Sequence, residues 1–298
     1  MNIKNFEVPK AKVDVVIDSD AYNEVDDQFA IAYALRSKEN INVRAIYAAP
    51  FSNSHAKTAE EGMEQSYNEI LTLLDLLGEQ VEVYRGSKTY LPDEKTPVIS
   101  DAANDLVKRA KEYSSEYPLY VVAIGAITNI ASALLLDPSI SENIVVVWLG
   151  GHAHHFFHNK EFNLKQDVAA ARVVMQSEAP FVQLPCKGVV DMFTISRIEL
   201  EHFFMGKNAL CDHLASHAIE HITKERKSDV WTKVIWDVVA IAWLMNKDDR
   251  FMFSRIIDVK LPEYGGFYTD EVVDKKMRYV FAVRRDEIFN DLLEKITK

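Results

Sequence analysis

Five acidic side chains fall within the ten residues DSDAYNEVDD, at positions 18–27, directly after the apolar run VDVVI. Asp18, Asp20, Asp26 and Asp27 are the four aspartates of this cluster, and Glu24 lies between the two pairs. Like charges at this density repel one another unless a positive group lies among them. Clustered carboxylates are the ligands that hard cations such as Ca²⁺ and Mg²⁺ prefer. Helix capping would explain one or two of these carboxylates but not all four aspartates, so we predict a metal site.

Two known classes of acidic motif fit the cluster poorly. An EF-hand loop that began at Asp18 would require glycine at position 23 and glutamate at position 29, where the chain has Asn23 and Phe29. The DxD pair after a strand is similar to the motif of haloacid-dehalogenase phosphatases, whose first aspartate is the nucleophile. Those enzymes usually carry Thr or Val where this chain has Tyr22, and their motif leaves the pair Asp26–Asp27 unexplained. A phosphatase is therefore the weaker alternative.

A distant carboxylate lies in the apolar run DVWTKVIWDVVAIAWLMNK. The pattern predicts a nearly all-apolar helix over residues 230–245, interrupted only by Lys233 and Asp237. Apolar neighbours on both sides indicate that Asp237 is buried, and a buried carboxylate needs a cation or hydrogen bonds. We expect Asp237 to share a metal with the first cluster, and pairing with a nearby lysine is the alternative.

Another polar pair stands in KEFNLKQD (160–167), shortly after the apolar run IVVVWLGG. Glu161 and Asn163 offer an acid and an amide, which together can accept hydrogen bonds from sugar hydroxyls and donate to them. Taken alone, the triplet Glu161–Phe162–Asn163 is a weak signal, since a loop glutamate and a helix N-cap would produce it too.

The order of the predicted elements indicates the fold that must position these residues. Short runs rich in Val, Ile and Tyr alternate with helical periodicity, and the predicted strands span residues 13–17, 42–49, 81–84, 119–125, 144–150, 181–184 and 277–283. This alternation predicts an α/β fold with a mostly parallel, Rossmann-like central sheet flanked by helices. Ligands of such folds bind at the carboxyl ends of the strands, where the acidic cluster lies. We expect Asn23 or Glu24 to cap the next helix, which places Asp26 and Asp27 in its first turn.

We interpret residues 1–298 as a single domain, with a mostly helical, cap-like region at about 190–235. The formal net charge of −11 and the absence of any Lys/Arg-rich run argue against nucleic acid as a partner. No apolar run approaches the roughly 20 residues that span a bilayer, and the first residues lack an apolar signal region. The chain has only Cys186 and Cys211, which favours a reducing, cytoplasmic compartment.

Together, these stretches resemble the nucleoside hydrolases, the calcium-dependent N-ribohydrolases of the inosine–uridine-preferring superfamily. The family's opening DxDPGxDD is similar to DSDAYNEVDD, although the Pro-Gly is missing and the spacing is two residues longer. The family's Gly-Asn is matched by Ser52–Asn53, its GxLTNxA by GAITNIA, and its MGG and EFN by LGG and EFN. Its closing acid is matched by Asp237 in WDVVAIAW. These landmarks occur in the family's order between residues 13 and 245.

The resemblance implies a role for each matched residue. A Ca²⁺ ion would be held by Asp20, Asp27, Asp237 and the backbone carbonyl of Ile124. Asp20 would be the general base that deprotonates the attacking water, and Asp26 would accept a hydrogen bond from a ribose hydroxyl. The rest of the sugar would be bound by Asn53, Glu161 and Asn163. The implied substrate is a nucleoside or related N-riboside, in nucleoside salvage, and the implied assembly is a homodimer or homotetramer.

The departures from the family concern the leaving base. Many relatives place a histidine immediately before the closing acid as the proton donor, where this chain has Trp236. A purine-preferring branch also uses Trp there and stacks it on the base, so Trp236 is our candidate for base contact and purines are mildly favoured; simple core packing is the alternative. The family's histidine-containing substrate loop has no counterpart. A non-catalytic protein that binds calcium and ribose therefore stands as the alternative function.

A histidine-rich segment, HAHHFFHNK (152–160), lies beside the proposed sugar loop. Its histidines suggest zinc, but no cysteine or second histidine pair completes a known spacing. A loop that lines the substrate is the better interpretation, and His154 or His155 could supply the missing acid.

Overall fold

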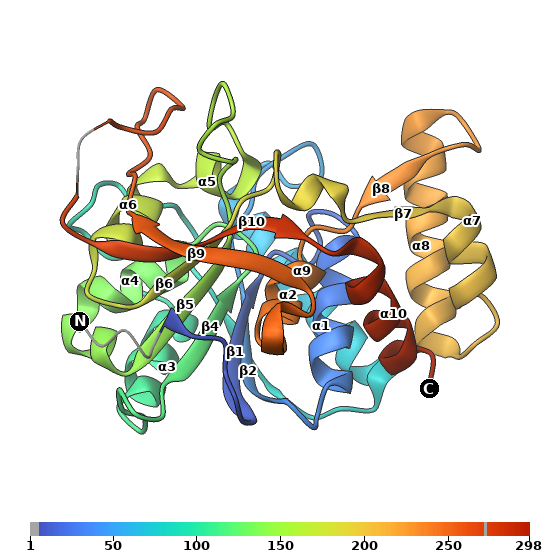
Figure 1. The fold of residues 1–298 in the computed structure, drawn as a ribbon, viewed down its shortest axis with the longest axis horizontal. Coiled ribbons are helices and arrows are strands. Elements are labelled where there is room, and N and C mark those ends of the chain that lie inside the picture. The colour runs from blue at the N-terminus through green and yellow to red at the C-terminus, as the bar shows by residue number, and fades with distance from the viewer. Residues whose placement is uncertain (1–5, 271–272) are drawn as a thin grey trace.

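An eight-stranded sheet runs through the centre of the protein in the computed structural model, which describes residues 6–270 and 273–298 (Figure 1). The strand order is β3-β2-β1-β4-β5-β6-β10-β9; all neighbours are parallel except the last pair, which is antiparallel. The strands are β1 (Val13–Ser19), β2 (Ile41–Ala48), β3 (Glu82–Arg85), β4 (Leu119–Ala123), β5 (Ile144–Leu149), β6 (Phe181–Leu184), β9 (Met252–Asp258) and β10 (Lys276–Val283). The mostly parallel α/β sheet predicted from the sequence is confirmed.

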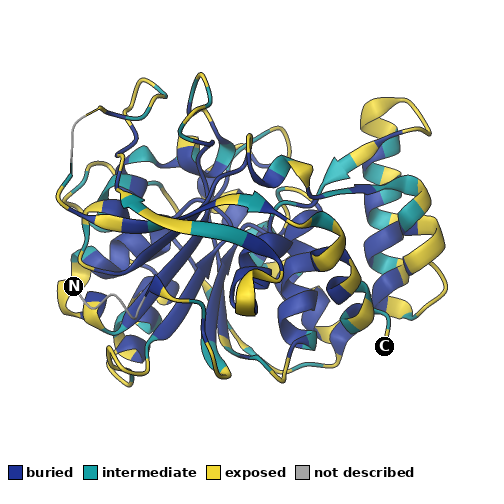
Figure 2. Ribbon diagram, in the orientation of Figure 1, coloured by how far each residue is buried: buried dark blue, intermediate teal, exposed yellow. Residues whose placement is uncertain are grey.

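Helices cover both faces of this sheet because the strand side chains alternate between two apolar layers. Val15 and Ile17 pack with one set of helices, whereas Val16 packs with the other. The first set comprises α1 (Asp26–Arg36), α2 (Ala59–Leu77), α9 (Val238–Trp243) and α10 (Arg285–Ile296), and the second comprises α3 (Asp101–Ala110), α4 (Thr128–Leu136) and α6 (Val168–Gln176). Figure 2 shows the resulting pattern, with buried central strands and helices exposed on their outer faces.

A largely helical segment lies beyond α1 and α10, at the right of Figure 1. It contains β7 (Thr194–Ser196), the single turn α7 (Arg197–Glu199), a π-helical turn at Leu200–Phe204, the long helix α8 (Ala209–Arg226) and β8 (Thr232–Val234). Strands β7 and β8 form a separate antiparallel pair. The predicted helical character of residues 190–235 therefore agrees with the structure, and the two short strands were not foreseen. The remaining short elements are α5 (Phe162–Gln166) and the 3-10 turns Pro138–Glu142, Val190–Met192 and Lys247–Asp249.

Two local predictions were wrong. The single helix expected over residues 230–245 is divided, since residues 232–234 form β8 and the helix begins only at Val238. Helix α1 is not capped by Asn23 or Glu24, because its N-cap is Val25, without a side-chain hydrogen bond. Both predicted caps are engaged elsewhere: Asn23 accepts a hydrogen bond from Asn53, and Glu24 pairs with Lys233. Asp26 and Asp27 nevertheless lie in the first turn, as predicted.

The strand order places the candidate residues at one edge of the sheet. From β1 the chain passes to β2 on one side and later to β4 on the other, so a crevice opens at the carboxyl ends of β1 and β4. Asp20 follows the end of β1 and Ile124 follows the end of β4. The backbone N–H of Ile124 donates to the carbonyl of Asp18 at 2.8 Å, which fixes the two strand ends side by side.

Among the helices in residues 6–270 and 273–298, none combines the length and the apolar character needed to cross a membrane.

Candidate functional site

A cavity of about 260 Å³ opens at the carboxyl ends of β1 and β4. It brings together residues that are up to 217 positions apart in the sequence, from Asp20 to Asp237. Of the residues predicted from the sequence, the cavity is lined by Asp20, Asp26, Asp27, Ile124, Glu161, Asn163, Trp236 and Asp237. Of the residues to which the family resemblance gives a role, only Asn53 lies outside it.

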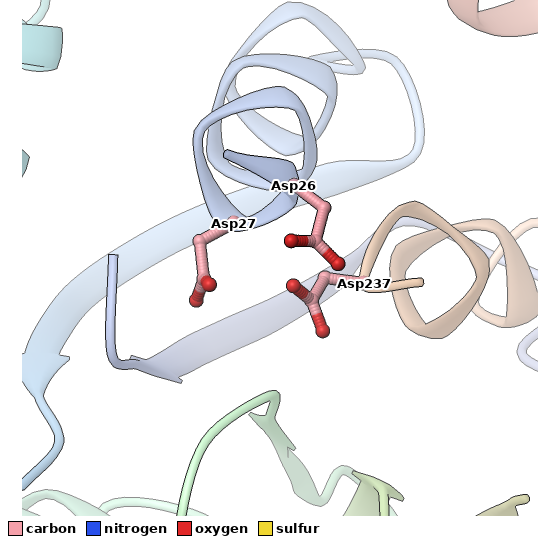
Figure 3. A group of neighbouring side chains, drawn as sticks. All are labelled: Asp26, Asp27 and Asp237. Atoms are coloured by element: carbon pink, nitrogen blue, oxygen red, sulfur yellow. The ribbon is translucent and has the colours of Figure 1, made fainter. Parts of the chain in front are cut away.

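Three carboxylates face one another across this cavity (Figure 3). Asp26 and Asp27 project from the first turn of α1, and Asp237 projects toward them from the residue before α9. One oxygen of each lies within 4.8 Å of one oxygen of each of the others. Within the part of the chain that the structure describes, this is the only group of three or more His, Cys, Asp or Glu side chains brought so close.

The carboxylate of Asp20 lies beside this cluster and against the end of β4. A Cβ atom at Gly125 would come within 2.8 Å of Asp20 Oδ1, so the glycine leaves the space that the carboxylate occupies. The Oδ2 atom of Asp20 is buried and has no hydrogen-bond partner. A buried carboxylate oxygen without a donor is costly, which indicates that a ligand normally supplies its partner.

The electrostatics of the cluster favour a cation. Burial raises the pKa of Asp20, Asp27 and Asp237 well above the ordinary aspartate value, and the negative charges of their neighbours raise it further. Burial also raises the pKa of Asp26 to about 6, although the Lys233 ammonium opposes this shift. A divalent cation among the four carboxylates would remove the repulsion and keep them ionised.

The donor atoms fit a hard ion such as Ca²⁺. The acidic side chains offer only oxygen, and Ile124, whose backbone carbonyl is the further candidate ligand, lines the same cavity. The nearby Lys233 does not serve as the counter-ion for the whole cluster, because its ammonium pairs with Glu24. The residues present therefore fit a calcium site.

Asp18, the first aspartate of the motif, does not line the cavity. Its side chain is fully buried, and Oδ1 accepts a hydrogen bond from Asn129 at 2.8 Å. Burial raises the pKa of this carboxyl to about 7. A phosphatase nucleophile must reach its substrate, so the position of Asp18 argues against the phosphatase alternative.

Glu161 and Asn163 line the same cavity and are tied to its backbone. Both Glu161 oxygens accept backbone hydrogen bonds, with Oε1 bound to Asn163 N and Oε2 to the N–H groups of Gly151 and Leu164, all at 2.9 Å. Asn163 Nδ2 donates to the carbonyls of Ile124 at 2.9 Å and Leu149 at 3.1 Å. Both predicted sugar ligands thus face the cavity while their side chains hold its backbone in place.

Trp236 lines both the first cavity and a second one of about 700 Å³. Its side chain is half-buried, and its backbone N–H donates to Asp26 Oδ2 at 3.0 Å. Asn53 lies in the second cavity, where its Oδ1 accepts from the backbone N–H groups of His55 and Ala56. The structure therefore does not bring Asn53 to the first cavity beside the carboxylates.

The histidine-rich segment contributes one side chain to the first cavity, and this is His152 rather than His154 or His155. The ring of His154 instead packs between Tyr268 and Tyr279. Burial lowers the pKa of both His152 and His154 to about 4, so neither is a ready proton donor at neutral pH. No histidine of this segment belongs to a metal-binding group in the described residues.

Sequence reasoning gave no site role to several other residues that line the first cavity, among them Leu149, Lys160, Cys186 and Lys187. Cys186 and Lys187 lie just after β6, outside any recognisable motif. The only sequence signal for them was their place directly after a predicted strand of the sheet, at the edge where ligands bind.

Comparison with known proteins identifies relatives of this architecture. The family model described as "Inosine-uridine preferring nucleoside hydrolase" matches residues 15–289. An inosine-guanosine nucleoside hydrolase structure aligns with a TM-score of 0.76 at 18% identity, covering 96% of this chain and 99% of that one. A purine-preferring ribonucleoside hydrolase from Gardnerella vaginalis aligns with a TM-score of 0.73 at 19% identity, covering 95% and 98%. A plant nucleoside hydrolase gives 0.75 at 17%, covering 96% and 99%. No curated protein matches the chain.

Proposed function

Since the chain belongs to the inosine-uridine preferring nucleoside hydrolase family, we propose that it hydrolyses the N-glycosidic bond of a ribonucleoside or related N-riboside with the help of Ca²⁺. The observation that carries this proposal is the cavity in which the carboxylates of Asp20, Asp26, Asp27 and Asp237 converge, all of them buried. The products would be ribose and the free base.

Asp20, Asp27, Asp237 and the Ile124 carbonyl would hold the Ca²⁺. The ion would lower the pKa of the attacking water and orient ribose hydroxyls. Asp20 would accept the proton of that water, since its Oδ2 has no other hydrogen-bond partner.

The remaining carboxylates and amides would bind the sugar. Asp26 would accept a hydrogen bond from a ribose hydroxyl. The backbone N–H of Trp236 donates to Asp26 Oδ2 and holds this carboxylate in place. Glu161 and Asn163 would contact the rest of the ribose, and Asn53 would do so only at the mouth of the second cavity. Cleavage passes through an oxocarbenium-like state, and the surrounding acidic side chains stabilise its positive charge.

Trp236 would stack on the leaving base. Its position between the two cavities and its half-buried side chain distinguish it from a core tryptophan such as Trp148, which is fully buried. A large indole face favours a purine, and this supports a purine preference.

A non-catalytic calcium- and ribose-binding protein is the alternative, motivated by Trp236 in the place of the histidine acid. The presence of Asp20 at the general-base position favours the enzyme, because a protein that only binds needs no general base.

The proposal also includes the cellular compartment and the oligomeric state. Cys186 and Cys211 are both free and buried, which supports a reducing compartment such as the cytoplasm, with a role in nucleoside salvage. We propose a homodimer or homotetramer, which light scattering of the purified chain would test.

The central test is reducing-sugar release from a panel of purine and pyrimidine nucleosides. The calcium-loaded wild type, the same protein with a chelator, and the Asp20→Ala variant are compared side by side. Release by the calcium-loaded wild type alone supports the hydrolase and identifies the base. Calcium binding without release from any nucleoside would instead favour the non-catalytic alternative.

A further inference from the structure

Helix α8 carries a row of histidines that the proposed function has not used. His213, His217 and His221 follow at intervals of four residues, so they share one side of the helix. This side faces α1 and α2, because His217 Nδ1 lies 3.3 Å from Gln28 Oε1 and His213 Nε2 lies 3.7 Å from Glu69 Oε1. The last of the row, His221, reaches the second cavity.

A fourth histidine meets this row from another part of the chain. His55, in the loop after β2, packs against His221 with ring centroids 5.7 Å apart. Both imidazoles line the second cavity, and both also line a smaller void of about 70 Å³ together with His217. Two imidazoles thus stand in the cavity that adjoins the carboxylates.

Trp236 connects this histidine pair to the proposed reaction. Because it lines both cavities, a base stacked on its ring would reach from the first cavity toward the second, which His55 and His221 line. Asn23, Glu24 and Phe162 line both cavities as well, so the two spaces adjoin along a shared wall.

We propose that the leaving base enters the second cavity and that His221, supported by His55, is the catalytic acid that protonates it. The inference rests on the proposed function. As the N-glycosidic bond breaks, its electron pair stays with the base nitrogen, which takes a proton from the His221 imidazolium. The attacking water gives one proton to Asp20 and forms the new bond to the sugar carbon. Transfer of that proton from Asp20 to His221 through solvent restores the enzyme, and the sum is riboside plus water giving ribose plus base.

His221 suits this role better than the other histidines near the site. His152 lines the first cavity, but burial lowers its pKa to about 4 and leaves it uncharged near neutral pH. His217 is held at Gln28, and burial together with the neighbouring His213 and His221 lowers its pKa as well. His221 is half-buried at the cavity wall, where solvent can return its proton.

Charged groups of both signs surround His221. The positive groups of the same cavities and helix are Lys224, Arg226 and Lys233, and the negative groups are Glu24, Glu220 and Glu225. Lys233 and Glu24 form an ion pair and largely cancel each other. Tyr22, His55 and His217 are the other titratable neighbours. These groups determine the charge around the imidazole that would donate the proton.

The test compares two ribosides that differ in their need for an acid. Inosine leaves with a base that must be protonated, whereas 4-nitrophenyl riboside leaves as a stable phenolate. In the calcium-loaded protein, His221→Gln should lower kcat for inosine by roughly 10²-fold. For 4-nitrophenyl riboside kcat should change by less than about twofold. His213→Gln, on the same helix side but outside the cavity, is the matched control and should leave both rates unchanged.

The possible outcomes separate this inference from the proposed function. Equal losses on the two substrates in His221→Gln, or no loss on inosine, would overturn the assignment of the acid while the hydrolase stands. Cleavage of 4-nitrophenyl riboside but not inosine by the wild type would overturn it as well, since no base would then be protonated. Cleavage of neither substrate would overturn both proposals. The calcium-induced rise in Tm, retained in His221→Gln, shows that the variant is folded.

Discussion

The side-chain amide of Asn163 donates a hydrogen bond to the backbone carbonyl of Ile124 at 2.9 Å, across 39 positions of sequence. The same Nδ2 atom also donates to the carbonyl of Leu149 at 3.1 Å, so one amide ties the ends of β4 and β5 together. If the Ile124 carbonyl is a calcium ligand, the hydrogen bond from Asn163 orients that carbonyl. Residues that orient metal ligands typically change affinity when they are removed.

We therefore expect Asn163→Ala to weaken calcium binding by about 10-fold or more, because the Ile124 carbonyl loses its fixed orientation. Isothermal titration of the calcium-free variant would measure the Kd. Asn53→Ala is the matched control, since Asn53 lies in the second cavity and its calcium Kd should stay unchanged. An unaltered Kd in Asn163→Ala together with a raised KM at saturating calcium would assign Asn163 to the sugar instead.

The carboxylate cluster predicts an unusual combination of effects for Asp237→Asn. Without metal, Asp26, Asp27 and Asp237 repel one another in a buried space, so neutralising one carboxylate should raise the Tm of the calcium-free protein by about 2–5 °C. The same variant should lose the calcium-induced rise in Tm and nearly all activity. Thermal unfolding with chelator and with added calcium measures both.

Asp258→Asn is the control for this prediction. Asp258 is exposed on the edge strand β9, pairs with Lys276 and does not line the cavity. The substitution should not appreciably change the Tm of the calcium-free protein or that of the calcium-loaded protein. A calcium-induced Tm rise of wild-type size in Asp237→Asn would remove Asp237 from the metal site.

The sequence was sufficient to predict the sheet and the place of the acidic cluster for a simple physical reason. Strands buried on both faces are continuous apolar runs, and polar residues that follow them must lie at the edge where ligands bind. The place of Asp20, Asp26 and Asp27 at this edge of the sheet could be predicted from the sequence alone. Strand β9 escaped detection because it is a partly exposed edge strand interrupted by Arg255, without a comparable run.

Other features depend on contacts between distant segments, which local pattern cannot reveal. Nothing in the apolar run over residues 230–245 predicts strand β8. That strand exists only because Thr232–Val234 pairs with β7. The His55–His221 contact brings a loop after β2 to the end of α8. The sequence likewise suggested that His154 or His155 lies at the site. In the structure the ring of His154 packs against Tyr268 and Tyr279, and His152 is the histidine of this segment that lines the first cavity.

Trp236→Ala should lower kcat/KM for inosine by roughly 10–100-fold, because stacking of a base on an aromatic ring contributes about 1–3 kcal/mol. Trp236→Phe should lose much less. The hydrogen bond to Asp26 comes from the backbone N–H of Trp236 and survives both substitutions, so the metal site is not altered directly. Steady-state kinetics with inosine and 4-nitrophenyl riboside, whose ring is smaller, would measure the difference. Equal losses on both substrates would contradict stacking on the base.

The burial of His154 predicts how stability depends on pH. Its pKa is lowered from 6.5 to about 4 by burial, while Gln183 opposes the shift. Between these two values the unfolded chain binds more protons than the folded one, so the free energy of unfolding must fall as the pH drops from about 6.5 to about 4. The half-buried ring is partly screened by solvent, and we expect its contribution to be roughly 2 kcal/mol.

Replacing His154 by Gln removes this titration. Denaturant unfolding at pH 7 and pH 4.5 should show that His154→Gln loses less stability on acidification than the wild type, by roughly 1–2 kcal/mol. His155→Gln alters the next residue, whose side chain is exposed, and should behave like the wild type. Equal acid losses in all three proteins would mean that His154 is already protonated in the fold, which its packing against Tyr268 and Tyr279 makes costly because a charged ring there would lose its hydration.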